Sequence, residues 1–534
     1  MQITTMVTMA ATVNKLGPRE MSRSALRQAP FAGIVSIFMA MTCALPAYAT
    51  DWRFEPSVGA SATYTDNVNQ SENNPEDALI LSVTPGFSLR SQGSRRVQAS
   101  MNYSLTGVSR YSEDNSTDLF HNLAAVGKAE LIEDFLFLDG TASISQALLS
   151  LTGSPAEATT NNSNRATVGV YSLSPYIQKR FGTFATGQAR YSTGGAIFGD
   201  NSGSDSVSNA FTAGLSSGPQ FNDLSWGLNY SLRQLDSSAT GGNSTFERTS
   251  GTLGYALTRK FRIFGTYGQE QNDYLNASGA DGVFYSVGFG WAPSRRTSIE
   301  ASIGERYFGR TYSFSGNHRT RASNWRLSYS EDVSDITERL LADSARAIWR
   351  CPNVVGGQYY LTPGLTPPFP TGCSAPLTAA TARALGATDA DLAPLGLLDV
   401  SLNSGVFVIK SLIAGVSWSK GRLGLGLSAF DTKRIYQSVA GTEDHTQGVS
   451  GTASYRLSPH TSANGSVSLS RNSTVSPINP SRQDDLATLS LGMNHRFDKD
   501  LSGALTYRFQ QRNSDAPNSD FNENSLTATA NIRF

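Results

Sequence analysis

The C-terminal segment Asn524–Phe534, NSLTATANIRF, alternates polar and apolar residues without a break. Its apolar residues occupy every second position: Leu526, Ala528, Ala530, Ile532 and Phe534. Successive side chains of a strand point to opposite faces, so this pattern predicts a strand with one apolar face and one polar face. The chain therefore ends on a two-faced strand whose last residue is aromatic.

The same alternation recurs along most of the chain. Representative segments are Trp52–Thr65, Leu79–Leu89, Val97–Thr106, Leu224–Arg233, Val283–Trp291, Ala487–Phe497 and Leu501–Phe509. A helix would scatter these apolar residues around its surface, because its period is 3.6 residues. The pattern predicts an all-β chain of about 22 strands.

The predicted connections fall into two alternating classes. The short class comprises Ser91–Arg95, Lys179–Thr183, Arg259–Lys260, Pro293–Thr297, Lys420–Arg422 and Asp498–Asp500. The long class comprises Asp66–Asp77, Leu149–Asn164, Gly194–Ser206, Asp236–Asn243, Gln271–Gly282, Asn472–Asp485 and Gln511–Glu523. This layout predicts a transmembrane antiparallel β-barrel with short periplasmic turns and long extracellular loops. The alternative, a soluble β-sandwich, would rarely contain so many long hairpins.

Composition agrees with a barrel in a membrane. Only 16% of the residues are charged, against about 25% in a typical soluble domain. Half of the side chains of each barrel strand face lipid, and the other half face the water-filled interior, where Ser, Thr, Asn and Gly are suitable. The formal net charge is +0, which argues against a nucleic-acid partner because such proteins carry a basic footprint.

The N-terminus has the layout of a signal peptide. Basic residues precede the apolar run Phe31–Leu45, and Ala47-Tyr48-Ala49 is a small-x-small cleavage site. We expect residues 1–49 to be removed, with translation starting at Met1 or Met21, and residues 50–534 to form the barrel. The expected location is the cell outer membrane. A membrane anchor is the alternative, but the run is short for a spanning helix.

One segment, residues 333–403, lacks the two-residue period and is rich in Pro and Ala. A connection of this length needs a special explanation. A variable surface loop is the favoured interpretation, and a constriction folded into the lumen is the alternative. Cys351 and Cys373 lie in this insert and are predicted to form a disulfide in an oxidising compartment.

Three blocks carry a resemblance to a known family: DWRFEPSVGASATYTDNVN, RYFGRTYSFSGNHRTRASNWRLSYSEDVS and VFVIKSLIAGVSWSKGRLGLGLSAFDTKRIYQ. They resemble the PEP-CTERM/exosortase system-associated outer-membrane β-barrel family of Gram-negative bacteria. The resemblance implies a link to exopolysaccharide and protein-sorting systems, and it supplies no catalytic residues. The terminal Phe534 likewise resembles the assembly signal on the closing strand of outer-membrane barrels, which implies the barrel assembly machinery as a partner.

Polar rows that include charged residues are predicted to face the lumen. The possible pore-lining residues are Arg53, Glu55, Arg190, Arg233, Arg262, Glu300, Arg306, Arg326, Arg456, Arg496, Arg508 and Arg533. Arginine rings favour anionic solutes. The competing interpretation is that these arginines pair with Asp and Glu and only stiffen the wall.

Motifs for catalysis, metals and cofactors are absent from the sequence, so neither a catalytic nor a cofactor site is predicted. His121 and His495 lie in apolar rows and are the candidates for a Ser–His hydrolase site, although a place near the lipid headgroups explains them more simply. The acidic residues Asp66, Glu72, Glu76, Asp77, Glu113 and Asp114 suggest either a divalent-cation site beside lipopolysaccharide or a solvated surface.

The leading functional hypothesis is a non-enzymatic pore or export-associated channel, linked to an exosortase or exopolysaccharide system. The alternative is a surface structural or adhesion barrel with a closed lumen. The expected partners are outer-membrane lipid and lipopolysaccharide, the barrel assembly machinery, and polysaccharide or exosortase-system components.

Overall fold

A computed structural model describes residues 51–534 with gaps at 93, 114, 153–163, 200–202, 238–241, 275–279, 345, 351–358, 364–404, 438–440 and 478–479. The predicted signal peptide, Cys351 and Cys373 lie outside the described residues, and their processing and pairing stay predictions.

The described chain is almost entirely strand. The barrel strands are β1 (Asp51–Thr65), β2 (Ala78–Gln92), β3 (Val97–Tyr111), β4 (Ser116–Ile132), β5 (Leu136–Leu148), β6 (Arg165–Phe181), β7 (Ala185–Phe198), β8 (Ser206–Ser217), β9 (Leu224–Ser237), β10 (Gly242–Thr258), β11 (Phe261–Asp273), β12 (Gly282–Ser294), β13 (Thr297–Arg306), β14 (Gly309–Arg319), β15 (Ser323–Asp335), β18 (Val406–Lys420), β19 (Leu423–Tyr436), β20 (Glu443–Arg456), β21 (Thr461–Val475), β22 (Arg482–Arg496), β23 (Leu501–Ser514) and β24 (Phe521–Arg533).

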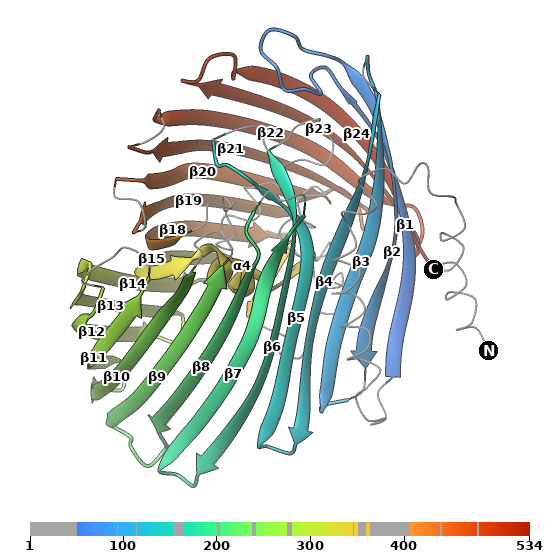
Figure 1. The fold of residues 1–534 in the computed structure, drawn as a ribbon. Coiled ribbons are helices and arrows are strands. Elements are labelled where there is room, and N and C mark those ends of the chain that lie inside the picture. Colours follow the sequence, from blue (N-terminus) through green and yellow to red (C-terminus); the bar gives the residue numbers. More distant parts are fainter. Residues whose placement is uncertain are drawn as a thin grey trace, which may run out of the picture. The chain divides into compact units, whose positions relative to one another are not determined.

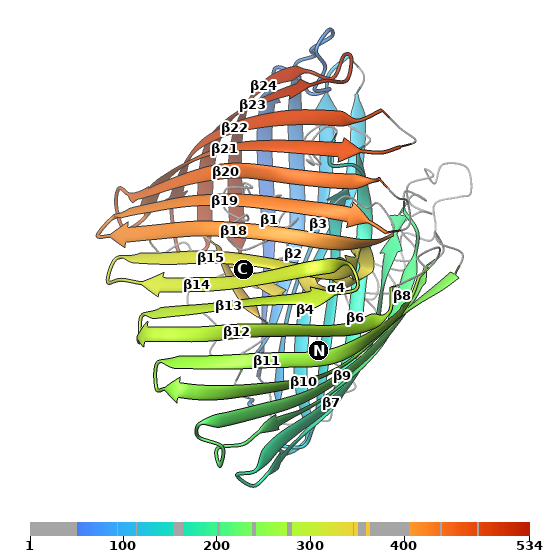
Figure 2. The same cartoon turned by 90° about the vertical axis from the view of Figure 1, so that its left-hand side faces the viewer.

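These strands form one closed antiparallel sheet of 22 strands (Figures 1 and 2). Each strand pairs with its neighbours in the chain, and β1 pairs with β24 from Ser57↔Arg533 to Thr65↔Ser525. The predicted fold class is therefore confirmed. Closure removes the unpaired edge strands that an open sheet would expose.

The barrel has an apolar outer face and a polar inner face. Directly paired residues lie on the same face, so the register carries each face from strand to strand. Large apolar side chains are exposed along the outer face, among them Leu253 at 63% and Tyr267 at 66%. Trp52, Tyr64, Trp291 and Tyr507 are exposed there too, in line with the aromatic belts of transmembrane barrels.

Hydroxyl groups pair across strands on the inner face. The oxygen–oxygen distance is 2.6 Å for Ser61 and Ser82 and 2.9 Å for Thr63 and Thr527. Ser and Thr therefore suit the inner rows, because they satisfy one another across the ladder.

The two ends of the barrel differ in their connections, as predicted. The short-turn end includes the two-residue turns 259–260, 295–296 and 421–422. Gly421 has a φ of +62°, a left-handed conformation that glycine adopts without strain. The long-loop end includes 66–77 and 149–164, which match the predicted bounds.

Several other predicted loops were too long. Strand β7 continues to Phe198, so the loop predicted to begin at Gly194 begins at Gly199. Likewise, strand pairing continues to Val475 and Ser514, well into the loops predicted from Asn472 and Gln511. Cross-strand hydrogen bonds join backbones whatever the side chains are, so pairing extends beyond the apolar band into polar residues.

The predicted insert begins later than expected, because Val333–Asp335 still pair with β18 as the end of β15, and it then continues into a helix inside the barrel. After β15, the helix α4 (Ile336–Ser344) contacts β5, β6, β7 and β8, which lie far around the barrel from β15. A short hairpin of β16 (Arg346–Arg350) and β17 (Tyr359–Pro363) follows. The favoured surface-loop interpretation is wrong for α4, which lies within the ring of strands (Figure 1). In the described chain, no helix is long and apolar enough to cross a membrane.

Candidate functional site in the barrel interior

The predicted pore-lining residues share the inner face. The register places all twelve of them on the face opposite the exposed apolar side chains, which is also the face that contacts α4. Their role in conduction stays a prediction. Most of them separate into two groups by height in the barrel and by exposure. Arg456, at the short-turn end of β20, and Arg508, in the middle of β23, are half-buried and belong to neither group.

Several arginines in the middle and long-loop part of the wall are paired with acids. Glu270, which is 2% exposed, lies between two of them. Its carboxylate is 2.8 Å from the Arg306 guanidinium and 3.4 Å from that of Arg248. Arg306 also pairs with Asp332 at 2.7 Å, and Arg190 pairs with Asp139 at 2.9 Å. In this group, the wall-stiffening interpretation fits the contacts.

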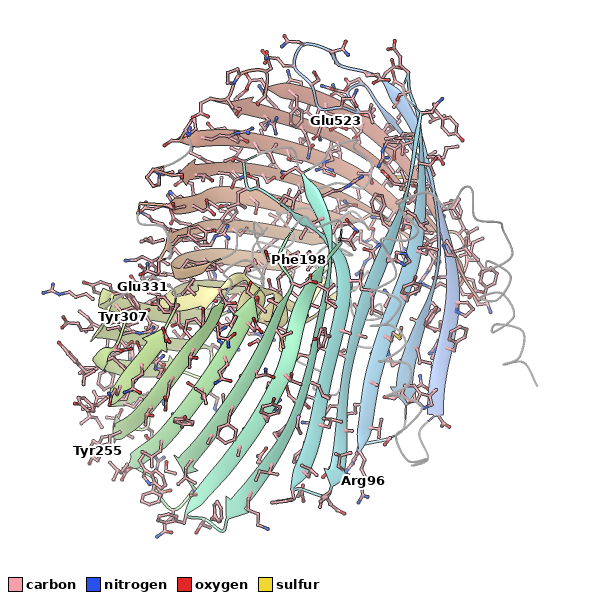
Figure 3. The ribbon with its side chains drawn as sticks, viewed as in Figure 1. Arg96, Phe198, Tyr255, Tyr307, Glu331 and Glu523 are labelled. Atoms are coloured by element: carbon pink, nitrogen blue, oxygen red, sulfur yellow. The ribbon has the colours of Figure 1, made fainter. Side chains whose placement is uncertain are left out.

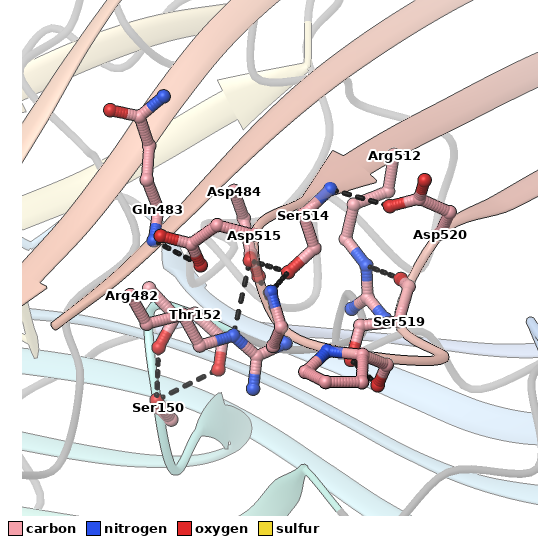
Figure 4. Close-up of polar contacts among 12 residues, drawn as sticks. Ser150, Thr152, Arg482, Gln483, Asp484, Arg512, Ser514, Asp515, Ser519 and Asp520 are labelled. Atoms are coloured by element: carbon pink, nitrogen blue, oxygen red, sulfur yellow. Dashed lines mark hydrogen bonds and ion pairs between the residues drawn. The ribbon is translucent and has the colours of Figure 1, made fainter. Parts of the chain in front are cut away.

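An ion pair and several hydrogen bonds stabilise the long-loop end at β22 and β23. The buried Asp484 accepts from Arg482 Nε at 3.1 Å and from Ser514 Oγ at 2.6 Å (Figure 4). Arg512 Nε donates to the Ser519 carbonyl at 2.6 Å. These contacts tie β22 and β23 to the loop 515–520, so this part of the rim is held by a polar network.

The closing seam has a polar network of the same kind. The buried Glu523 accepts from Thr65 Oγ1 at 2.8 Å and from Gln70 Nε2 at 3.0 Å. Asn67 Nδ2 donates to the Asn522 carbonyl at 3.0 Å. The loop that follows β1 thereby fastens β1 to β24 at the long-loop end, where Glu523 is labelled in Figure 3.

A second group of arginines lies near the short turns and is exposed. We call Arg53, Arg262, Arg319, Arg326, Arg496 and Arg533 the mouth arginines. They lie at or within a few residues of the strand ends at the short-turn end, on the inner face. The side chains of Arg53 and Arg262 are 62% and 57% exposed even though they pair with Glu55 and Glu300. In this group, the pore-lining interpretation fits the exposure.

Helix α4 is fixed to the inner wall by an apolar contact. Ile336 is buried among Ala166, Val168, Val170, Ala196 and Phe198 of β6 and β7, and Leu340 and Leu341 pack against the same cluster. Gly194 allows the close approach, because a Cβ there would lie 2.9 Å from Leu341 Cδ2. This apolar patch on the inner wall is the docking site of the helix.

Polar contacts complete this attachment. The Asp335 carboxylate caps the helix, since Oδ1 accepts from the Glu338 amide at 2.9 Å. Its other oxygen pairs with Arg233 of β9, and Arg233 also lies 3.4 Å from Glu338. Thr337 and Ser206 of β8 share a hydrogen bond of 2.8 Å. One carboxylate thus both starts the helix and fastens it to the wall.

Glu338 is perturbed by its place in the lumen. Burial raises the pKa of the Glu338 carboxyl above its ordinary value, and the Arg233 guanidinium acts against that rise. The Ser334 hydroxyl also donates to this carboxylate at 2.9 Å. The charged form of Glu338 is therefore disfavoured while α4 is docked.

Sequence reasoning missed the helix and several inner arginines. Asp335 and Glu338 form a D-x-x-E capping signature before apolar residues at helical spacing, which could have revealed α4. Arg319 occupies an inner row and belongs with the mouth arginines.

The two candidate histidines, His121 and His495, each have a ring hydrogen bond to a group other than serine. His121 Nδ1 lies 2.7 Å from the Tyr103 hydroxyl, and His495 Nδ1 lies 2.9 Å from Thr461 Oγ1. For the acidic loop residues, the Glu76 carboxylate accepts from Asn69 and from the Glu113 amide. Asp114 lies outside the described residues. Across the described chain, no group of three or more His, Cys, Asp or Glu is arranged to hold a metal ion.

Two shallow grooves run along the outer face rather than through the interior. One is lined by apolar side chains of β18 to β22, including Trp418, Leu427 and Val467. The other lies at the edge of the polar zone beside Asp431, Arg471 and Asp485. Both lie on the lipid-facing surface.

Comparisons with solved structures give matches at low identity. The siderophore receptor PirA from Pseudomonas aeruginosa is 9% identical, with 90% of this chain and 80% of that chain covered and a TM-score of 0.41. The FrpB iron transporter from Neisseria meningitidis (F5-1 variant) is 11% identical, with 90% of this chain and 82% of that chain covered and a TM-score of 0.46. A loop-deletion mutant of OmpT, an outer membrane protein of Vibrio cholerae, is 8% identical, with 91% of this chain and 100% of that chain covered and a TM-score of 0.31. No protein-family model and no curated protein matches the sequence.

The chain is an outer-membrane β-barrel. Its own architecture supports this: the sheet is closed, its strand number is even, and its outer face is apolar. In lipid, every backbone polar group must be satisfied within the protein, and a closed barrel achieves this. Barrels of this kind reside in bacterial outer membranes.

Proposed function

We propose that this protein is a channel of the outer membrane whose lumen is narrowed by helix α4. The observation that carries the proposal is the attachment of α4 to the inner wall through Ile336 and through the Arg233–Asp335 pair. A barrel of 22 strands is wide enough to enclose a plug. Helix α4 is held by one apolar cluster and a few polar contacts, so it can narrow the lumen and still detach from the wall.

The polar inner wall supports a solute path rather than a solid core. Inner rows carry Ser, Thr, Asn and Gly, and the mouth arginines are exposed. Arginine rings favour anions. We therefore propose a preference for anionic solutes, with acidic exopolysaccharide as the solute class and export as the direction.

The link to an exosortase or exopolysaccharide system rests on the sequence resemblance alone. It predicts that deletion of the gene in its own bacterium lowers the amount of extracellular polysaccharide while cell-associated polysaccharide accumulates. Lipopolysaccharide, the barrel assembly machinery and exosortase-system components are the proposed partners. Unchanged polysaccharide in both fractions would argue against the link.

The constriction is tested by planar-bilayer conductance of Arg233→Ala. Removing the guanidinium leaves Asp335 and Glu338 without their wall partner, so we expect α4 to undock more often and mean conductance to rise. The matched control is Arg190→Ala, which removes another paired inner arginine, from Asp139, that does not touch α4. Equal conductance of both variants and the wild type would contradict a constriction at α4.

The second candidate function is a closed surface barrel whose loops carry the role. The buried polar networks of the long-loop end favour it, because they hold that rim together. A full-length protein that never conducts, together with an Arg233→Ala variant that also stays closed, would favour this candidate.

A further inference from the structure

The charges of the barrel are divided between its two ends, although the whole chain is neutral. Among described loop residues of the long-loop end outside the insert, every charged side chain is acidic: Asp66, Glu72, Glu76, Asp77, Glu113, Asp205, Asp281, Asp515 and Asp520. In the described short turns, bases outnumber acids: Arg95, Arg96, Arg259, Lys260, Arg295, Arg296, Arg321, Arg422 and Lys499 against Glu133, Asp134, Asp223, Asp498 and Asp500.

The mouth arginines extend this basic end into the lumen. They come from two parts of the wall, one running from β22 through β24 to β1 and the other from β11 to β15. Arg319 and Arg326 lie on adjacent strands, since Asn317 pairs with Arg326 and Arg319 with Asn324. Like charges placed around one opening raise the local potential and concentrate anions there.

The position of these arginines favours a flexible polymer over a folded protein. Their side chains project from the inner wall, below the turn tips, where a thin chain reaches them more easily than a globular surface. Asn317, Asn324, Asn494 and Asn531 lie on the same inner rows. Amides of this kind exchange hydrogen bonds with the hydroxyls of a sugar.

We propose that the short-turn mouth is the entry site for an acidic polysaccharide that arrives from the periplasm. The mouth arginines bind its carboxylates, and the acidic long-loop end repels the same charges and disfavours return. This inference rests on the proposed channel, for which it names the solute-binding residues and the entry side.

Binding is measured first, because it does not require conduction. The probe is a fluorescent polygalacturonate oligomer, titrated into full-length protein in neutral detergent at low and high salt. We expect binding that weakens with salt. The variant Arg319→Ser/Arg326→Ser/Arg496→Ser should raise the dissociation constant about tenfold, since each exposed ionic contact contributes modestly. The control, Arg310→Ser/Lys433→Ser/Arg471→Ser, removes three bases near the long-loop end on the outer face of the barrel and should bind as the wild type does.

A bilayer measurement then tests the entry side. The same oligomer should block current when added at the short-turn face and fail to block at the opposite face. Wild-type affinity in the mouth variant, equal loss in the control variant, or equal binding of neutral dextran would overturn the inference. Competition by a small folded acidic protein would assign the surface to protein docking and would overturn it too. Binding without any conduction would instead refute the channel and leave the site standing.

Discussion

At the scale of single residues, the inner arginines divide by their partners. Arg306 shares two carboxylates with its neighbours and is largely buried, whereas Arg326 is exposed at the short-turn end. A buried arginine without its acid is costly, because desolvation is no longer offset by an opposite charge. We therefore expect the two kinds of arginine to have different roles: stability in the paired group and, if the proposed channel is correct, solute contact in the exposed group.

Glu270 tests the first role. Replacing Glu270 with Ala leaves Arg306 and Arg248 facing each other without their shared acid, and we expect the free energy of unfolding to fall by about 3 kcal/mol. Urea unfolding in lipid, followed by tryptophan fluorescence, measures this change. The control is Glu300→Ala, whose carboxylate is half exposed and pairs with Arg262 alone; there we expect less than about 1 kcal/mol. Equal losses would contradict the division.

Phe534 tests the closing strand. Its amide donates to the Pro56 carbonyl at 2.9 Å, while the residue as a whole is 72% exposed. Deleting Phe534 removes one backbone contact of the seam and the terminal aromatic. We expect less assembled barrel in the outer membrane, measured by heat-modifiable migration. An assembled fraction equal to that of the wild type would refute a role for this residue in assembly.

At the scale of elements, α4 is defined by what surrounds it. Asp335 ends the pairing of β15 with β18, caps α4 and binds Arg233. Nine residues make a short helix that gains its stability from packing rather than from its own propensity. Docking and folding of α4 should therefore be coupled.

Glu338 makes this coupling sensitive to pH. Its pKa is raised in the docked state, so docking is strongest when the carboxyl is protonated and weakens as pH rises through the raised value. We expect conductance to fall as the medium is acidified from neutral toward the ordinary glutamate range. Glu338→Gln should remove this pH dependence and keep conductance low throughout. A variant with the wild-type pH profile would show that another group titrates.

At the scale of the whole molecule, the opposite charges of the loops at the two ends give the barrel an electric dipole along its axis. Exposed charges at an opening raise or lower the local concentration of each ion, and salt screens this effect. We expect the current through an oriented channel to rectify at about 0.05 M salt and to become nearly symmetric at about 1 M. Rectification that is independent of salt would indicate a voltage-dependent conformational change instead.

The wall of the barrel was predictable because each strand carries its own signal. Alternation in segments such as Leu224–Arg233 fixes which side chains share a face, and closure then follows from the number of strands and the lipid environment. The division among the arginines was not predictable. Arg233 and Arg326 each follow an apolar residue in an alternating segment, and the acid that neutralises Arg233 lies 102 residues away.

Closure between β1 and β24 also sets the order of assembly. Every other strand of the barrel pairs with its neighbour along the chain, whereas Thr63 and Thr527 meet across 464 residues. We expect local hairpins to form before a contact of such separation, because the entropic cost of closing a loop rises with its length. The growing sheet consequently keeps two unpaired edge strands until β24 is in place. We therefore expect the pairing of β1 with β24, rather than the formation of hairpins, to limit the rate of barrel assembly.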